Sequence, residues 1–244
     1  MKKLLALLFV VLMMVACFAG CGSKDTLVMG TNATFPPYEY VDDNGEIVGI
    51  DAEIAAAVAE KLGMELEIKD MEFDSLLTAV QSKTIDIALA GMTVTDERKL
   101  SVNFSDTYAK GVQVIIVPEN SAIKTVDDLK GKKIGVQTGT TGDIYCTDEF
   151  GQENVNQYQN GALAVAALNN GQIDCVVIDN EPAKNFVKAN TGLKILDTEY
   201  ANEDYAAAIS KENTELLENF NKALKELKDD GTVDKIIAKY IPAE

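Results

Sequence analysis

The chain has 244 residues, of which 39 are acidic and 22 basic, and its formal net charge is −17 at pH 7. This balance argues against nucleic-acid binding, which requires basic patches. Histidine and tryptophan are absent, so Ser-His-Asp and Cys-His catalytic systems and histidine metal sites are excluded. We expect neither a metal nor a cofactor.

Residues 1–20 have the pattern of a secretory signal. Two lysines precede an uninterrupted apolar run over 4–18, which has the length of a signal core and is short for a membrane span. Small residues stand directly before Cys21, which suits cleavage in front of that cysteine and its lipidation. Cys17 is a weaker candidate, and an ordinary signal with a chance cysteine is the alternative. The sequence predicts an extracytoplasmic protein anchored to the cell membrane at Cys21.

In the first half of the mature chain, short apolar runs alternate with helical patterns. The apolar residues of 50–62 keep one helical face, with Asp51 as a plausible N-cap and Gly63 as the C-terminal stop. A helix opening at Asp74 is expected next. The predicted strands of this half are 27–30, 66–68 and 85–90, and 31–40 is read as a loop.

The second half repeats this alternation, which is typical of α/β proteins. Its predicted strands are 112–117, 134–136, 155–158, 174–178 and 205–209. Four helices are predicted in this half. One follows residue 142, one covers 162–168, one ends at residue 228 and one covers 232–240. Similar segments at 82–86 and 170–174 end a helix and open a strand in each half. No low-complexity linker separates the halves, so we expect two similar lobes joined by strands.

Arg98 is the single arginine of a lysine-rich chain. Its position after a strand and a Gly-Met-Thr loop suits a planar, bidentate clamp for a carboxylate. A surface residue in the first turn of a helix beginning at Thr95 is the alternative. The loop 139–142 follows a strand and opens a helix, so its amides suit an anion, although a plain capped turn fits equally.

Three further residues are candidates for ligand contact. Asp179 ends an apolar strand and suits an ammonium group, or it caps a helix before Pro182. Phe35 and Phe73 suit aromatic walls of a site, and each alone also fits a core position.

Several segments together resemble the polar amino-acid-binding proteins of ABC importers, the family 3 solute-binding proteins. The resemblance rests on TNATFPPYEY at 31–40, GID at 49–51 and AGMTVTDER at 90–98. It continues at 104–108, 135–141 and 174–179, and it covers essentially the whole mature chain in order.

The resemblance implies an α/β, two-lobed periplasmic-binding-protein fold with two hinge crossovers and the ligand in the interlobe cleft. Lobe 1 would comprise 24–109 plus 206–244, and lobe 2 would comprise 110–205. The implied partners are a free L-amino acid and the permease and ATPase subunits of an ABC transporter. We expect a monomer without enzymatic activity that delivers a polar amino acid by hinge closure.

The resemblance also implies roles at the amino-acid end of a ligand. Arg98 would clamp the α-carboxylate, helped by the Thr93 hydroxyl and the Thr141 amide. The Gly91 carbonyl and Asp179 would take the α-ammonium.

The side chain of the ligand would lie between Phe35 and Phe73, with Asn32 and Gln137 at its far end. Relatives that bind basic amino acids often carry an acid at the position of Asn32. A neutral amide there favours a glutamine-like ligand, because amides both donate and accept hydrogen bonds. Glu39 or Glu181 could instead supply charge for a basic ligand.

Two alternatives stay open. An enzyme on the same scaffold, such as a cyclohexadienyl dehydratase, would use Asp179 or Glu181 as an acid. Cys146 and Cys175 could pair in an oxidising compartment, although the apolar surroundings of Cys175 favour two buried free thiols.

Overall fold

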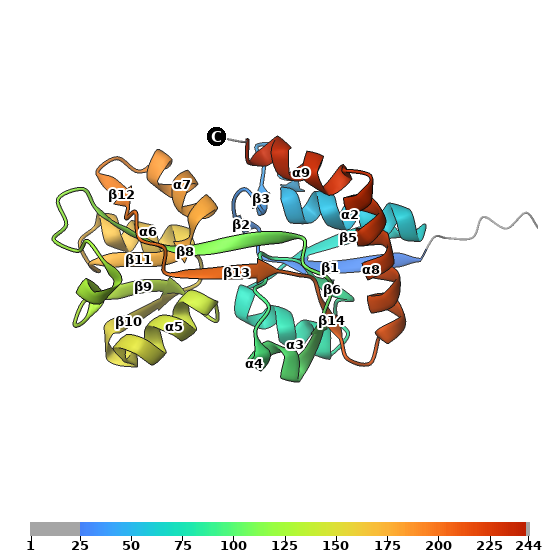
Figure 1. Cartoon of the computed structure of the whole chain (residues 1–244), viewed down its shortest axis with the longest axis horizontal. Helices are drawn as coiled ribbons and strands as arrows, with labels where there is room; N and C mark the ends of the chain where they lie inside the picture. Colours follow the sequence, from blue (N-terminus) through green and yellow to red (C-terminus); the bar gives the residue numbers. More distant parts are fainter. Residues whose placement is uncertain (1–24, 243–244) are drawn as a thin grey trace, which may run out of the picture.

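The computed structural model describes residues 25–242. The predicted signal segment 1–20 and the lipid-anchor candidates Cys17 and Cys21 lie outside these residues. Two lobes, each with its own sheet, lie side by side along the long axis of the molecule (Figure 1). The predicted two-lobed α/β fold is confirmed.

The first lobe contains a five-stranded sheet in the order β5-β1-β6-β14-β7. β1 is parallel to β5 and β6, whereas β14 is antiparallel to β6 and β7. The strands are β5 (Glu65–Asp70), β1 (Thr26–Thr31), β6 (Ile87–Ala88), β14 (Ala208–Ser210) and β7 (Val102–Phe104). A small antiparallel sheet contains β2 (Thr34–Phe35), β3 (Glu39–Val41) and β4 (Ile47–Val48). The helices are α2 (Ile50–Leu62), η1 (Phe73–Ser75), α3 (Leu76–Gln81), α4 (Asp96–Ser101), α8 (Thr214–Asp229) and α9 (Thr232–Tyr240).

The second lobe contains a sheet in the order β10-β9-β11-β8-β12, with β13 also paired to β8. Its strands are β10 (Val155–Tyr158), β9 (Ile134–Gln137), β11 (Cys175–Asp179), β8 (Ala109–Pro118), β12 (Leu193–Ile195) and β13 (Ala201–Tyr205). Its helices are η2 (Val126–Leu129), α5 (Thr141–Phe150), η3 (Gln152–Asn154), α6 (Gly161–Asn169) and α7 (Asn180–Ala189). Figure 1 shows α6 and α7 on one face of this sheet and α5 on the other.

The antiparallel strands β8 and β13 run between the lobes (Figure 1). Their pairing extends from Ala109 opposite Tyr205 to Gln113 opposite Ala201. β8 continues into the second sheet, while the chain after β13 passes through Ala206 and Ala207 into β14 of the first sheet. The predicted lobe boundaries, at 109–110 and 205–206, fall at these two crossovers and remain predictions.

Helix α2 has the predicted bounds and ends at Gly63, whose left-handed φ of 71° suits glycine. The predicted N-cap is wrong. Gly49 occupies that position, and a Cβ there would lie 2.3 Å from the Tyr38 carbonyl oxygen. Asp51 lies inside the first turn, where its Oδ2 accepts hydrogen bonds from the Gly91 amide (2.8 Å) and the Tyr108 hydroxyl (2.6 Å). A tertiary contact has therefore replaced the expected local one.

Two predicted strands are also shorter or divided. Only Ile87–Ala88 of the segment 85–90 is a strand, because the chain leaves the sheet toward the interlobe region. The predicted strand 205–209 divides into the end of β13 and β14, since the chain crosses between the lobes there. The segment 31–40, predicted as a loop, contains the short strands β2 and the start of β3.

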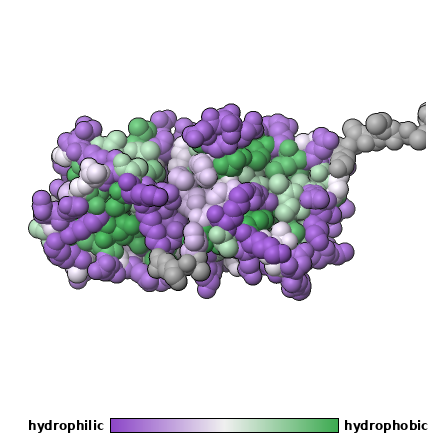
Figure 2. All heavy atoms as spheres, turned by 90° about the horizontal axis from the view of Figure 1, so that it is seen from above, coloured by the Kyte–Doolittle hydropathy of each residue, from purple (hydrophilic) through white to green (hydrophobic). Residues whose placement is uncertain are grey.

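The surface is mainly polar. Seen from above, apolar side chains form separate patches on the two lobes, surrounded by hydrophilic residues (Figure 2). Within residues 25–242, no helix has the length and apolarity needed to cross a bilayer.

Candidate functional site

An enclosed cavity lies between the lobes. Its empty volume is about 310 Å³. All nine residues predicted as ligand contacts line it: Asn32, Phe35, Phe73, Gly91, Thr93, Arg98, Gln137, Thr141 and Asp179. Glu39, Ala90 and Thr140 complete the lining. The structure brings the predicted residues together, whereas their roles in binding remain predictions.

Strand ends place most of these side chains. Asn32 directly follows β1, and the loop after β6 carries Gly91 and Thr93. In the second lobe, Gln137 and Asp179 are the last residues of the parallel strands β9 and β11. Carboxyl ends of parallel strands meet at one sheet edge, which is where open α/β sheets bind ligands. The two sheets present these edges to the same cavity.

The Arg98 guanidinium is buried and held by two carbonyl oxygens. Its Nη1 donates to the Thr93 carbonyl (2.7 Å) and its Nη2 to the Gly139 carbonyl of the second lobe (3.0 Å). The guanidinium carbon lies 5.5 Å from the Phe73 ring centroid. In the described part of the chain no carboxylate forms an ion pair with Arg98, and burial lowers its pKa. An anionic ligand would supply the missing partner.

The start of α5 faces the same cavity. The Thr140 hydroxyl caps this ten-residue helix by accepting from the Asp143 amide (3.3 Å). Thr141, the first helical residue, is buried and lines the cavity. Amides in a first turn have no partner within the helix and carry partial positive charge. The Thr141 amide therefore suits a carboxylate.

Asp179 belongs to a buried network on the crossing strands. It accepts hydrogen bonds from the Gln113 side chain (2.8 Å) and from the Tyr205 hydroxyl. Gln113 also donates to Glu203 (3.1 Å). Burial, followed by repulsion from Glu203, raises the pKa of Asp179 to about 7. An ammonium group would remove the cost of ionising this carboxyl. Asp179 precedes α7, but its side chain makes no capping hydrogen bond.

Gln113, Glu203 and Tyr205 were missed by the sequence reasoning. Gln113 lies inside an apolar run that indicated a plain core strand, and no strand was predicted over 201–204. Only the pairing of β8 with β13 brings them to Asp179. Gly111 leaves room for the Tyr205 hydroxyl, which would lie 2.1 Å from an added Cβ.

The Thr93 hydroxyl does not have the free donor that the predicted carboxylate contact requires. It donates its single proton to Glu203 (2.9 Å). Only its lone pairs face a ligand, and these suit a donor such as an ammonium group.

Asn32 and Gln137 bond to each other across the lobes. Gln137 Nε2 donates to Asn32 Oδ1 (2.8 Å) and to the Gln159 carbonyl (3.1 Å). Asn32 Nδ2 donates to the Met71 carbonyl (2.9 Å), and its Oδ1 also accepts from Thr34 (2.9 Å). This leaves one N–H on Asn32 and the Oε1 of Gln137 for a ligand.

Glu39 is an acid of the lining whose side chain lies in hydrogen-bond contact with another acid, Asp51. It is 1% exposed, and neither carboxyl oxygen receives a hydrogen bond from another residue. Asp51 Oδ1 also receives no N–H or hydroxyl hydrogen bond, and a single proton between the two carboxyl groups links them. Burial, followed by the Asp51 charge, raises the pKa of Glu39 well above its usual range. Glu181 is different: it pairs with Lys184 (2.8 Å) and does not line the cavity.

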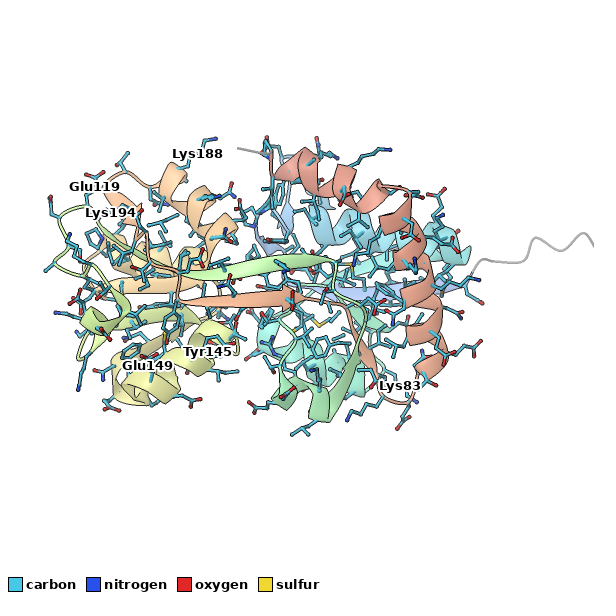
Figure 3. All side chains as sticks on the ribbon, in the orientation of Figure 1. Lys83, Glu119, Tyr145, Glu149, Lys188 and Lys194 are labelled. Atoms are coloured by element: carbon cyan, nitrogen blue, oxygen red, sulfur yellow. The ribbon has the colours of Figure 1, made fainter. Side chains whose placement is uncertain are left out.

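The cavity is poor in cations. Arg98 is the one basic residue among its described lining residues, beside the acids Glu39 and Asp179. The labelled Lys83, Lys188 and Lys194 lie at the outer parts of the lobes and point away from the interlobe region (Figure 3).

Other candidate sites in residues 25–242 are weaker. No group of three or more Cys, Asp or Glu side chains in these residues is arranged for a metal ion. An open groove with an empty volume of about 1420 Å³ lies between the β7 region and α8, and it shares no lining residue with the cavity. Cys146 and Cys175 are buried free thiols in the core of the second lobe.

Comparisons with known proteins agree with this geometry. The family model of the bacterial extracellular solute-binding proteins, family 3, matches residues 27–243. The arginine-binding extracellular protein ArtP of Bacillus subtilis is 37% identical over all of both chains. A probable histidine-binding protein of Neisseria gonorrhoeae is 35% identical over 88% of this chain and 83% of its own. The solved structure of an ancestral arginine-binding protein bound to glutamine has a TM-score of 0.86 and 45% identity, covering 90% of this chain and 99% of that one.

Proposed function

Because the chain belongs to the bacterial extracellular solute-binding proteins, family 3, we propose that it captures a polar L-amino acid and delivers it to an ABC permease with its ATPase. One observation carries the proposal. A buried arginine that pairs with no carboxylate of residues 25–242 and a buried aspartate line one closed cavity between two lobes. An amino acid carries a group of opposite charge for each of them.

The α-carboxylate would bind the free N–H groups of Arg98 and the amide of Thr141. Charge-assisted bidentate contacts are among the strongest hydrogen bonds in proteins. The α-ammonium would contact Asp179, the Gly91 carbonyl and the lone pairs of the Thr93 hydroxyl. This role for Thr93 differs from the one expected from the sequence, because its hydroxyl already donates its hydrogen bond to Glu203.

The side chain of the ligand would lie between the rings of Phe35 and Phe73 and end near Asn32 and Gln137. We favour a basic amino acid, and arginine first. The surplus of acids in the cavity supports this choice, as do relatives named for arginine and histidine.

Glutamine is the second candidate, for a specific reason. The one N–H of Asn32 and the Gln137 Oε1 that remain free match the carbonyl and the amino group of a side-chain amide. A related arginine-binding protein has been solved with glutamine bound.

Binding would close the lobes around the ligand by bending at the crossovers of β8 and β13. Arg98 and Gln137 already make bonds between the lobes, and a ligand held by both lobes would add to them. We further propose that Cys21 carries the lipid that keeps the protein at the outer face of the cell membrane, and that it acts as a monomer without enzymatic activity.

The test is a melting-temperature screen of the chain from residue 25, stripped of ligand by unfolding and refolding, against each of the twenty amino acids. Ligands of the folded state raise the midpoint by mass action. Calorimetric titration then ranks arginine, lysine, histidine and glutamine. A protein that none of the twenty stabilises is not an amino-acid-binding protein of this kind. Turnover of prephenate or arogenate would favour the dehydratase alternative.

A further inference from the structure

Glu203 is a buried acid on the crossing strand β13 that is bonded to the cavity wall without lining the cavity. Its side chain is 5% exposed, and its Oε2 accepts hydrogen bonds from the Thr93 hydroxyl (2.9 Å) and the Gln113 side-chain amide (3.1 Å). Well-packed apolar side chains often stabilise such a position as well as a buried charged group does. The presence of an acid there therefore requires an explanation.

The bond from Thr93 to Glu203 determines what Thr93 offers to a ligand. A threonine hydroxyl has one proton to donate and two lone pairs. A carboxylate only accepts, so the Thr93 proton points to Glu203 and the lone pairs are left for the cavity, which Thr93 lines. A neighbour that could itself donate, such as an amide group, would free this proton to turn toward the ligand. Glu203 therefore makes Thr93 an acceptor.

The bond from Gln113 to Glu203 acts in the same direction on Asp179. Gln113 Nε2 has two hydrogens, and it donates to Asp179 Oδ2 (2.8 Å) and to Glu203 Oε2 (3.1 Å). Tyr205 donates to the other oxygen of Asp179. Every hydrogen of this network thus points to an acid, and lone pairs remain on the side of the ligand. An ammonium group, with three donors and no acceptor, is the complement of such a wall.

On the basis of the proposed function, we infer that Glu203 is the positioning residue of the ammonium site: by accepting from Thr93 and Gln113, it turns their hydrogens away from the cavity, so that the ligand meets only acceptors there. A carboxylate at this end of the cavity would be repelled. Glu203 thereby also fixes which way round the amino acid lies, with its carboxylate toward Arg98.

Glu203→Gln tests this role with little change in side-chain shape. Its amide group can donate to the Thr93 oxygen, which releases the hydroxyl proton toward the ligand. Calorimetric titration of the chain from residue 25 at pH 8 should show a roughly 10- to 100-fold loss of affinity for every amino acid that the wild type binds, as for loss of one hydrogen bond to a charged group. Asp204→Asn is the matched control, because it removes the same charge from the neighbouring, exposed position of β13. It should leave affinity unchanged.

The pH profile of binding separates positioning from packing. The titratable and charged groups around Asp179 come from both lobes and from the crossing strands: Tyr38, Glu39, Arg98, Tyr145, Glu203 and Tyr205. After burial, the charge of Glu203 is the main cause that raises the pKa of Asp179. Without that charge Asp179 ionises at lower pH, so the rise of affinity with pH should move down by about one pH unit in Glu203→Gln. A variant that only loosens the packing would bind more weakly without this displacement.

Glu203→Asp separates the reach of the side chain from its charge, and it keeps the inference testable if Glu203→Gln does not fold. Its carboxyl group is one methylene shorter, while the pairing of position 203 with Gly111 holds the backbone in place. It cannot keep both hydrogen bonds, so we expect about 10-fold weaker binding with the pH midpoint of the wild type.

Wild-type affinity of Glu203→Asp would overturn the inference. So would a Glu203→Gln variant whose affinity or pH midpoint equals that of the wild type, or an equal loss of affinity in Asp204→Asn. Failure of the wild type to bind any amino acid is a different outcome, because it refutes the proposed function itself.

Discussion

Replacement of Arg98 by lysine tests whether the binding site needs the geometry of the guanidinium or only its charge. Arginine has five N–H donors, and two of its nitrogens already bind the carbonyls of Thr93 and Gly139. Up to three N–H groups remain for a carboxylate. Lysine has three donors in all, so the same two carbonyls would leave one. Arg98→Lys therefore loses about one charge-assisted hydrogen bond to the ligand.

Such a bond contributes about 1.5–3 kcal/mol, which corresponds to roughly a 10- to 150-fold loss of affinity. Arg98→Ala removes the cation altogether, and we expect a loss of about 2–5 kcal/mol. Both losses should be similar for arginine and glutamine, because the α-carboxylate is common to them. Calorimetric titration measures them, and Lys99→Ala is the matched control, since Lys99 is exposed and its ion pair within residues 25–242 is with Asp96. Near-normal affinity of Arg98→Ala for every amino acid would falsify the assignment of the carboxylate site.

Three other changes test the rest of the lobes. Asp179 has a pKa of about 7, so ligand-free stability should fall as the pH rises from about 4 through 7, while affinity for amino acids should rise over pH 6–8. Asp179→Asn should flatten both curves and weaken binding, and unchanged pH profiles would show that another group titrates. Gly111→Ala should destabilise the protein by about 1–3 kcal/mol in urea unfolding and weaken binding, because its Cβ would lie 2.1 Å from the Tyr205 hydroxyl. Wild-type stability and affinity would mean that the hydrogen bond from Tyr205 to Asp179 is not needed. Cys146 and Cys175 should react with a thiol reagent only after unfolding, because both are buried and burial raises the pKa of both thiols. If neither cysteine reacts in the unfolded protein, the two form a disulfide.

Local patterns predicted the elements well where local interactions decide them. Helix α2 has the predicted bounds because its apolar spacing and the glycine at its end are both local signals. The N-cap at Asp51 was wrong because the carboxylate bonds to Gly91, forty positions away in the chain, and no local rule includes that contact.

The candidate site was predictable to the extent that its residues are unusual in type or belong to recognisable segments. Arg98 is the only arginine of the chain, and Asn32 and Phe35 lie in a motif shared with a family. Glu203 and Gln113 carry no such signal. An acid among other acids, and a glutamine within an apolar run, acquire meaning only when two strands far apart in the sequence pair.

In the proposed mechanism, the same pairing would link ligand binding to the hinge. Gln113 on β8 donates to Asp179 and to Glu203 on β13, and the Thr93 hydroxyl donates to the same Glu203. A ligand shifts the balance between open and closed forms only by the difference in its affinity for the two. In the proposed cycle, a ligand held first by the first lobe gains its contact with Asp179 only when the lobes meet, so the free energy of that contact favours the closed form. The residues proposed to recognise the ammonium group are thus hydrogen-bonded to the two crossing strands, and a change in their charge is expected to alter affinity and closure together.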